Sequence, residues 1–250
     1  MTLLAHISDL HLDGTPRATE RVERTMDHLR ALPTPPDALL VTGDIADHGE
    51  VAEYREAARL LQAPFPVLAC PGNHDSRSAL RTVLLDGSAG EQPVNQAHRI
   101  GELTVLMCDS TIPGSDEGEL GEATLSWIDQ AVHDLGQNDP AVLVFHHPPV
   151  PVHHPMPDSV PLRNPDALAA LLARNTSIIA VLGGHSHTAA ASAFAGRPCL
   201  LAPAVAWTLV MPPQTGRIAD RDADPGVAFH VIENGQITSH FRTVPGNAGS

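Results

Sequence analysis

Five short clusters of metal-binding side chains occur along the chain in a fixed order. Aspartate, asparagine and histidine supply the oxygen and nitrogen ligands that transition metals accept. A carboxylate has two oxygens and can bridge two ions, whereas an imidazole cannot, so the set suits hydrolysis at two metal ions, with Asp44 as the candidate bridge. The clusters are Asp9-Leu10-His11, Gly43-Asp44-Ile45-Ala46-Asp47, Gly72-Asn73-His74-Asp75, His146-His147-Pro148-Pro149 and Gly184-His185-Ser186-His187.

Each cluster directly follows a short apolar run that predicts a buried strand. Runs of this length, rich in Val, Ile and Leu, suit strands that are covered on both faces. Proteins with α/β folds place ligands at the carboxyl ends of their strands, so we expect the clusters to converge at one rim. The runs are Leu3 to Ile7, Ala38 to Val41, Val67 to Cys70, Val142 to Phe145 and Ile178 to Leu182.

Taken singly, the clusters also have ordinary explanations. An Asp after a strand is most often a helix cap or a turn residue. The His146-His147 pair can be ordinary loop histidines. The Gly-His-x-His cluster is more specific, because alternate residues of an extended segment face the same way and two imidazoles can converge. The ordinary explanations would have to hold five times at once, so the joint pattern favours one site.

The order of these motifs resembles the calcineurin-like metallophosphoesterase superfamily, whose pattern is D-x-H, G-D-x-x-D, G-N-H-D/E, H and G-H-x-H. The flanks resemble the branch with class III cyclic-nucleotide phosphodiesterases and bacterial glycerophosphodiesterases. The resemblance runs from about Leu3 to about Pro203, and the stretch after 203 is unassigned. The flanking segments are Thr42 to Gly49 with Tyr54 downstream, Asp109-Ser110, Gly118 to Leu120 before Trp127, and Phe145 to Val150.

The resemblance also implies a ligand set for each ion. Asp44 bridges, and His146 is chosen over His147 because of the family's His-x-Pro spacing. Ligands of nitrogen and oxygen without thiolate suit manganese, iron, zinc or cobalt better than copper(I), and the imidazoles disfavour magnesium alone. One ion is expected at Asp9, His11, Asp44 and His187, and the other at Asp44, Asn73, His146 and His185.

Three further residues in these clusters are expected to act without binding metal. His74 lies next to Asn73, and both are expected to contact the substrate. His74 is the candidate catalytic residue, which would stabilise developing charge or protonate the leaving oxygen, and the alternative is a supporting structural histidine. Asp47 and Asp75 are expected to orient loops or imidazoles, although Asp47 could instead cap a helix that begins near Val51.

The clusters are spread from Asp9 to His187, which predicts a single domain over residues 1–250, because dividing the chain would separate them. Lys plus Arg total 15 against 29 Asp plus Glu, a net charge of −14. This balance argues against a nucleic-acid polymer as partner, as does the small number of aromatic residues for base stacking: 5 Phe, 2 Trp and 1 Tyr. A small phosphodiester is compatible, because bound metals supply positive charge locally.

The location and assembly of the protein are less constrained. We find no signal segment and no apolar stretch near the roughly 20 residues that span a bilayer, so we expect a cytoplasmic protein without a membrane partner. A homodimer is left open. Cys70, Cys108 and Cys199 lie in or beside strand-like runs, which predicts buried thiols rather than disulfides or metal ligands.

Strand-like and helical segments alternate along the chain, which predicts an α/β fold. The resemblance implies a four-layer α/β/β/α sandwich of two mixed sheets. Between Pro148 and Pro165 seven prolines exclude regular helix and central strand, so we expect an irregular loop and propose it as a substrate lid. The helical segments are Thr19 to Ala31, Val51 to Gln62, Glu122 to Leu135 and Pro165 to Ala173; further strands are Thr104 to Cys108, Arg197 to Leu201 and Val227 to Ile232.

We therefore expect a dinuclear metal-dependent phosphodiesterase that uses metal-activated hydroxide on a small phosphodiester, with a 3′,5′-cyclic nucleotide as the first candidate. A glycerophosphodiester or phosphomonoester hydrolase would share every ligand, so only pocket and lid residues would discriminate. A non-catalytic interaction module would be expected to lack ligands, and this sequence lacks none of them.

Overall fold

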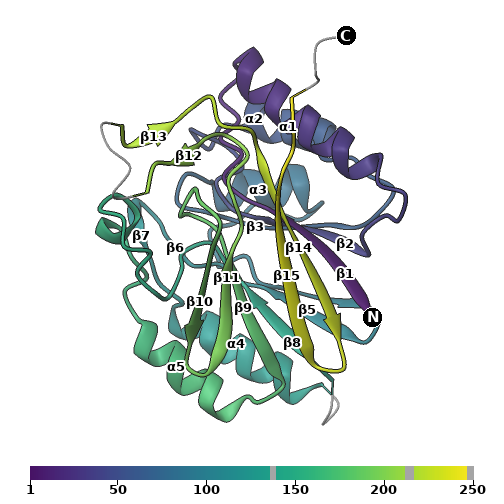
Figure 1. Cartoon of the computed structure of the whole chain (residues 1–250). Coiled ribbons are helices and arrows are strands. Elements are labelled where there is room, and N and C mark those ends of the chain that lie inside the picture. Colours follow the sequence, from purple (N-terminus) through teal and green to yellow (C-terminus); the bar gives the residue numbers. More distant parts are fainter. Residues whose placement is uncertain (136–138, 212–216, 247–250) are drawn as a thin grey trace.

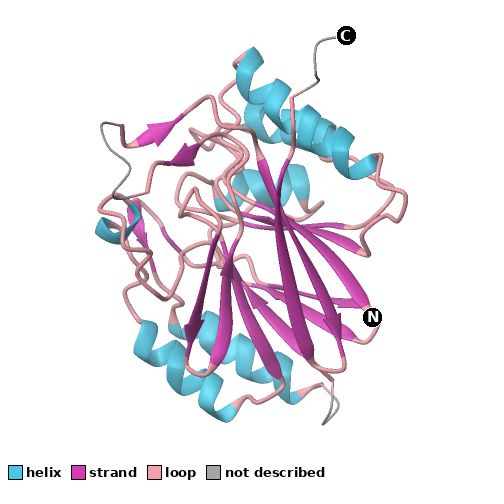
Figure 2. Cartoon of the chain, viewed as in Figure 1, coloured by secondary structure: helices cyan, strands magenta, loops and turns pink. Residues whose placement is uncertain are grey.

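Two mixed β-sheets face one another, and helices cover both outer faces (Figures 1 and 2). The computed structural model describes residues 1–135, 139–211 and 217–246. The first sheet has the order β15-β14-β1-β2-β3 and the second has the order β10-β11-β9-β8-β5-β4. This arrangement is the expected four-layer sandwich.

The first sheet contains β1 (Thr2–Ile7), β2 (Ala38–Thr42), β3 (Val67–Cys70), β14 (Gly226–Glu233) and β15 (Gln236–Thr243). The second contains β4 (Gln96–Ile100), β5 (Leu103–Met107), β8 (Ala141–Val144), β9 (Ile178–Gly183), β10 (Ala190–Phe194) and β11 (Arg197–Leu201). Two small pairs, β6 (Thr111–Ile112) with β7 (Ser115–Gly118) and β12 (Thr208–Leu209) with β13 (Ala219–Asp220), lie outside these sheets.

Successive side chains of a strand point to opposite faces of its sheet, so they belong to different layers of the core. In β2, Leu39 and Val41 pack with the helices on the outer face, whereas Leu40 points into the layer between the sheets. In β8, Leu143 faces the helices of the other side and Val144 faces the same inter-sheet layer. Because both faces of these strands are covered, each run is apolar throughout, as the sequence indicated.

The helices divide between the two outer faces. α1 (Pro16–Arg30), α2 (Val51–Leu60) and α3 (Arg77–Leu84) cover the first sheet, and α4 (Glu122–His133) and α5 (Pro165–Arg174) cover the second. Thr15 caps α1, with Pro16 at the first helical position, and Glu50 and Glu53 form a capping box on α2. Asp47 is therefore not the cap of α2, and that alternative is wrong.

The stretch after 203 belongs to the fold. β14 pairs antiparallel with β1, and β15 extends the sheet beyond it. The strand expected over Val227 to Ile232 is confirmed, and β15 was not predicted. The other expected strands and helices are all present, with ends shifted by up to three residues, while α3, β4, β10 and the two small pairs (β6 with β7, β12 with β13) were not predicted.

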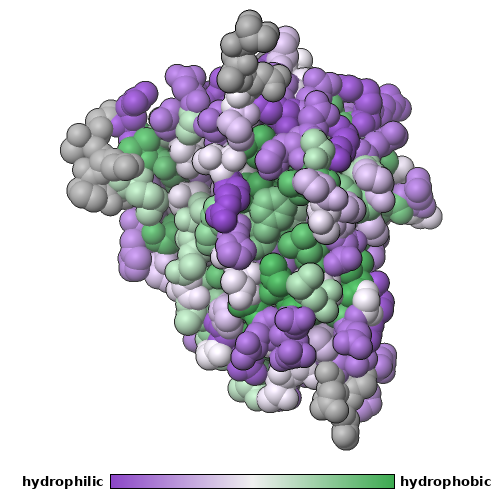
Figure 3. Space-filling view, turned by 45° about the vertical axis from the view of Figure 1, so that its right-hand side comes forward, coloured by the Kyte–Doolittle hydropathy of each residue, from purple (hydrophilic) through white to green (hydrophobic). Residues whose placement is uncertain are grey.

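Figure 3 shows one face on which hydrophobic side chains gather across the middle and hydrophilic side chains lie above them.

Cys70, Cys108 and Cys199 are free and buried, so the expectation of buried thiols is confirmed. In the described part of the chain, no helix is both long enough and apolar enough to cross a membrane.

Candidate metal centre

The five predicted clusters meet at one end of the two facing sheets. β1, β2 and β3 run parallel, as do β8 and β9, so their carboxyl ends point to a common rim. Backbone hydrogen bonds join the loops after β1 and β2 there: among them, Asp9 N–H donates to the Gly43 carbonyl (3.1 Å) and His11 N–H donates to the Asp44 carbonyl (2.9 Å). The expected convergence is thus present.

Five candidate ligands have a left-handed backbone. Asp9, His11, Asp44, His185 and His187 have φ between 44° and 65°. A non-glycine residue in this region costs on the order of 1–3 kcal/mol and is found mainly where the surroundings require a particular side-chain direction. These turns direct the side chains back over the strand ends.

Two glycines of the motifs allow close approach of the loops. A Cβ atom at Gly72 would overlap Asp44, and a Cβ atom at Gly184 would overlap Ser8. Any larger residue would push apart loops that carry candidate ligands, so steric crowding explains why both positions are glycine.

The first group of candidate ligands is Asp9, His11, Asp44 and His187. Their ligand atoms lie within 4.8 Å of one another, and all four residues are buried or nearly so. His187 Nε2 is 3.5 Å from Asp9 Oδ1, and His11 Nε2 is 3.6 Å from Asp44 Oδ2. Among the described residues, both carboxylate oxygens of Asp9 are buried without a hydrogen-bond donor. A bound cation would compensate the charge of such a buried carboxylate.

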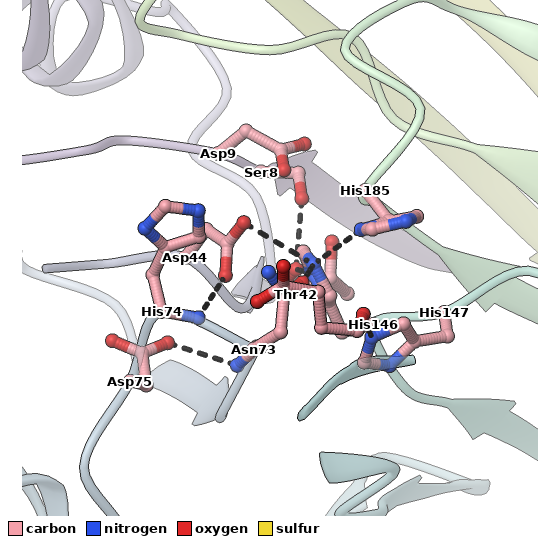
Figure 4. A network of polar contacts seen from close by, with 12 residues as sticks. Ser8, Asp9, Thr42, Asp44, Asn73, His74, Asp75, His146, His147 and His185 are labelled. Atoms are coloured by element: carbon pink, nitrogen blue, oxygen red, sulfur yellow. Dashed lines mark hydrogen bonds and ion pairs between the residues drawn. The ribbon is translucent and has the colours of Figure 1, made fainter. Parts of the chain in front are cut away.

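The second group surrounds His146 at the other side of Asp44. His146 Nε2 is 3.4 Å from Asp44 Oδ2 and 3.1 Å from both Asn73 Oδ1 and His185 Nδ1. His185 Nε2 is buried and has no hydrogen-bond partner among the described residues. Figure 4 shows Asp9, Asp44, Asn73, His146 and His185 directed toward one region. Asp44 Oδ2 contacts a histidine of each group, His11 and His146.

The tautomers of three histidines leave their Nε2 atoms free for an ion. His11 Nδ1–H donates to Asp47 (2.7 Å), His146 Nδ1–H donates to the Thr42 carbonyl (2.7 Å) and His187 Nδ1–H donates to the Trp207 carbonyl (3.1 Å). Each neutral ring then has a bare Nε2, yet the Nε2 atoms of His11 and His187 are only 3.1 Å apart. Two lone pairs at this distance fit ligation of a common cation.

His147 differs from its neighbour, because both of its ring nitrogens are occupied by protein groups. Its Nδ1 lies 2.9 Å from Ser110 Oγ, and its Nε2 lies 3.2 Å from the Asp116 carbonyl. His147 therefore holds the loop that carries β6 and β7 against the centre. These contacts favour His146 as the ligand.

Asp47, His74 and Asp75 support the two groups. Asp75 accepts hydrogen bonds from Gly72 N (2.9 Å), Ile45 N (3.2 Å), Ala46 N (3.0 Å) and Tyr54 Oη (2.8 Å), so it ties the second and third clusters together.

Asp47 orients His11, as described above. His74 donates from its backbone N–H to Asp44 (3.0 Å) and from Nδ1 to the Asp47 carbonyl (2.8 Å), and its side chain is 40% exposed.

The charges of the site favour binding of cations. Burial opposes ionisation of Asp44, but the neighbouring His146 and His11 hold the pKa of this carboxyl well below its usual range. Burial also opposes protonation of His146, yet Asp44 and Asp9 raise its pKa to about 9. Burial lowers the pKa of His185 to about 4. An ion that binds His146 must therefore displace a proton at neutral pH.

Trp207 is a site residue that the sequence did not indicate. Its ring stacks on His187, with centroids 3.8 Å apart and planes at 27°, and its carbonyl fixes the tautomer of the same histidine. It lies in the stretch that was left unassigned. Its only sequence signal was that it is one of two tryptophans in the chain.

The chain is similar to known proteins in sequence and in fold. The model of the calcineurin-like phosphoesterase family matches residues 2–189. The chain is 33% identical over 237 residues to a cAMP/cGMP dual specificity phosphodiesterase of Mycobacterium tuberculosis. The aligned region covers 90% of this chain and 74% of the relative. It is 32% identical over 197 residues to a glycerophosphodiester phosphodiesterase of Enterobacter lignolyticus. This aligned region covers 74% of this chain and 70% of the relative.

A solved structure has the same fold. A dimetal phosphatase from Danio rerio superposes with a TM-score of 0.70, covering 98% of this chain and 96% of that chain, at 13% sequence identity. At this identity the likeness concerns the fold alone.

Proposed function

This chain belongs to the calcineurin-like phosphoesterase family and is a phosphoric ester hydrolase, and from that premise we propose that it cleaves a 3′,5′-cyclic nucleotide at a centre of two metal ions. The observation that carries the proposal is the position of Asp44 between two groups of candidate ligands. The unpartnered atoms of Asp9 and His185 support it, because each group then contains a buried atom that is free to bind a cation.

Asp9, His11, Asp44 and His187, whose ligand atoms lie close together, would hold one ion. Asp44, Asn73, His146 and His185 would hold the other, because His146 Nε2 contacts each of the remaining three. Manganese, iron, zinc or cobalt suit such a mixture of imidazole and oxygen ligands. Bound ions supply Lewis acidity, which activates water and neutralises the phosphoryl oxygens. The buried carboxylates and the fixed Nε2 atoms are the contribution of the protein to this chemistry.

His74 is the residue that we assign to proton transfer. Its Nδ1–H is held by the Asp47 carbonyl, so Nε2 is the atom that faces the substrate. The imidazolium form would donate from Nε2 to the leaving oxygen, while Asn73 and His74 together contact the phosphoryl group. The ring packs edge-on against His11 with centroids 4.7 Å apart, which limits its rotation.

The cyclic-nucleotide substrate is supported by the relative from Mycobacterium tuberculosis, which is named for activity on cAMP and cGMP. A second candidate is a glycerophosphodiester, because the relative from Enterobacter lignolyticus, at 32% identity, is named for that activity. Both reactions would use the same ligands and differ in the groups that bind the organic part of the substrate.

The substrate test is a panel of phosphate esters assayed after the protein has been loaded separately with manganese, iron, zinc or cobalt. The panel contains cAMP, cGMP, 2′,3′-cyclic nucleotides, glycerophosphodiesters and nitrophenyl mono- and diesters. We expect the highest kcat/KM for a 3′,5′-cyclic nucleotide. A higher value for a glycerophosphodiester would replace the first candidate by the second.

The centre itself is tested with Asp44→Asn. The amide lacks the negative charge that bridges the ions, so we expect loss of at least one ion per chain and of nearly all turnover, with the fold retained. Elemental analysis, circular dichroism and the preferred ester measure these three properties. Asp86→Asn is the matched control, since Asp86 is exposed at the end of α3. Two ions per chain with near-normal turnover in Asp44→Asn would exclude the bridge.

A further inference from the structure

A small cavity lies beside the candidate metal centre. Its volume is about 160 Å³, and its walls include His11, Asp13, Arg17, Arg21, Trp207 and Arg221. His11 is a candidate ligand, and Asp47, which orients it, lines the same cavity. Sites that enclose a drug-sized ligand measure roughly 300–1,000 Å³, so this one has room for a single ring system. We call it the Trp207 cavity.

Trp207 is fixed in place by the centre and provides a flat wall. It stacks on His187, and its ring centroid is 6.5 Å from that of His11. The side chain is only partly buried, and it also lines the cavity. A phosphodiester bound at the ions would therefore place its organic substituent within reach of an aromatic surface.

The charges around the cavity nearly cancel. Three arginines line it, but Asp13 and Asp47 line it as well. Arg17 is 3.9 Å from Asp222, and Arg21 donates to the carbonyls of Val205 (2.7 Å) and Ala223 (2.5 Å). A second phosphate would need an excess of free cationic donors, and most of these donors are engaged.

Arg221 is the remaining cationic group. It is exposed at the cavity, and it forms no ion pair or hydrogen bond with any residue that the structure describes. A guanidinium near an aromatic wall suits a flat ring, because it can lie against the ring face or donate to acceptors on the ring edge. Donors and acceptors thus surround a flat aromatic surface.

We propose that the Trp207 cavity binds the nucleobase of the substrate, with the base against Trp207 and Arg221 while the phosphate lies at the metal centre. This inference rests on the proposed function, and it assigns the group that distinguishes a nucleotide from a glycerophosphodiester. A neutral planar base with donors and acceptors matches the size, the aromatic wall and the small net charge of the cavity better than an anion does.

The test measures binding rather than turnover. Isothermal titration calorimetry compares 5′-AMP with ribose 5-phosphate, which carries the same phosphate and sugar but no base, in the manganese-loaded protein. Stacking of one base on an aromatic side chain predicts about 5- to 100-fold tighter binding of 5′-AMP. Ribose 1,5-bisphosphate serves as the probe for an anion in place of the base.

Variants at Trp207 and Arg221 locate the effect. Trp207→Ala is expected to remove most of the preference for 5′-AMP, whereas Trp207→Phe retains most of it because an aromatic face remains. Arg221→Gln is expected to reduce the preference by about 2- to 10-fold. Arg55→Gln, which removes an exposed arginine from α2 outside the cavity, is the control and is expected to leave the preference unchanged.

Equal affinities for 5′-AMP and ribose 5-phosphate in the wild-type protein would overturn the proposal. A preference that survives both Trp207→Ala and Arg221→Gln, or tighter binding of ribose 1,5-bisphosphate than of 5′-AMP, would do the same. Because no turnover is needed, failure of the proposed function is seen separately. A protein that hydrolyses cAMP without preferring 5′-AMP contradicts only the base site, and one that prefers 5′-AMP without hydrolysing cAMP contradicts only the reaction.

Discussion

Five of the seven candidate ligands at this centre combine an unfavourable backbone conformation with the burial of a polar side chain. The left-handed conformations of Asp9, His11, Asp44, His185 and His187 and the orphaned carboxylate of Asp9 both cost free energy in the folded chain. Bound cations would offset the burial of charge by binding the folded state alone. At the scale of single residues, these costs are explained by the ions that the site is arranged to hold.

His74 gives the sharpest prediction at this scale, because it contacts candidate ligands without belonging to either group. His74→Ala is expected to lower kcat by about 10²- to 10⁴-fold for cyclic nucleotides while the metal content stays the same, since the ring supplies only proton transfer. The loss is expected to shrink for nitrophenyl diesters, whose leaving group needs little protonation. Steady-state kinetics and elemental analysis of the same preparation measure both effects.

His48→Ala is the matched control for His74→Ala. His48 is exposed on the neighbouring loop, which carries Asp47, and its Nε2 lies 3.5 Å from Asp47 Oδ2. A parallel loss of metal and activity in His74→Ala would make His74 a ligand instead. An undiminished loss with nitrophenyl substrates would replace proton donation by stabilisation of charge.

At the scale of elements, the loop from Pro148 to Pro165 is more ordered than its proline content indicated. It contains a short 3₁₀ helix, Pro157–Ser159, and Asp158 accepts a hydrogen bond from Val152 N–H (2.8 Å). Gly118 N–H donates to the Pro161 carbonyl (3.0 Å), which ties the loop to β7. Its role as a substrate lid stays a prediction.

A loop variant can test the lid without disturbing these contacts. His153, Pro155 and Met156 are exposed, whereas His154 and Pro157 are buried. Replacing the three exposed residues by glycine and serine is expected to change the ratio of kcat/KM between cyclic nucleotides and linear diesters severalfold, with two ions still bound, because only groups outside the centre change. Shortening the exposed loop over residues 87–90 is the control. An unchanged ratio across the panel would exclude the lid.

At the scale of the whole molecule, two buried histidines, His6 and His230, are expected to make the free energy of unfolding depend on pH. His6 Nδ1 lies 3.0 Å from His230 Nε2, His6 Nε2 lies 2.9 Å from Thr42 Oγ1, and His230 Nδ1 lies 2.7 Å from Ser239 Oγ. Burial lowers the pKa of His230 to about 3, and burial together with the charge of His230 lowers the pKa of His6 well below its usual range. Both rings are therefore neutral in the folded protein.

Acidification should consequently destabilise the fold. Below about pH 6.5 the unfolded chain binds a proton at each of these histidines, whereas folded His230 stays neutral until about pH 3. The free energy of unfolding is then expected to fall with decreasing pH between these values, by up to about 1.4 kcal/mol per pH unit for each histidine. At higher pH this contribution is constant.

The measurement is urea unfolding between pH 4.5 and pH 7.5. His230→Gln removes one titrating group, so its free energy of unfolding is expected to depend less steeply on pH than that of the wild type, whatever its absolute stability. His240→Gln, at an exposed position on β15, is expected to keep the wild-type slope. Identical slopes for His230→Gln and the wild type would contradict the assignment.

The amino-acid sequence by itself determined which residues are candidate ligands and where they would meet. Asp9, Asp44 and His185 could be selected because metal binding requires particular residue types and because an apolar run before each of them predicts a strand. The α/β class and most strands followed from the same local periodicity. β15 was missed because its burial is only partial and because only Ile237 and Phe241 of its 8 residues are apolar.

Tertiary structure alone decided how the residues of the site are held. The occupied ring nitrogens of His147, the Thr42 carbonyl that orients His146 and the stacking of Trp207 on His187 all join positions far apart in the chain. Such contacts depend on strand order and on the packing of one sheet against the other, and local sequence patterns do not encode either. For that reason the cavity beside Trp207, unlike the ligands, could be found only in the folded chain.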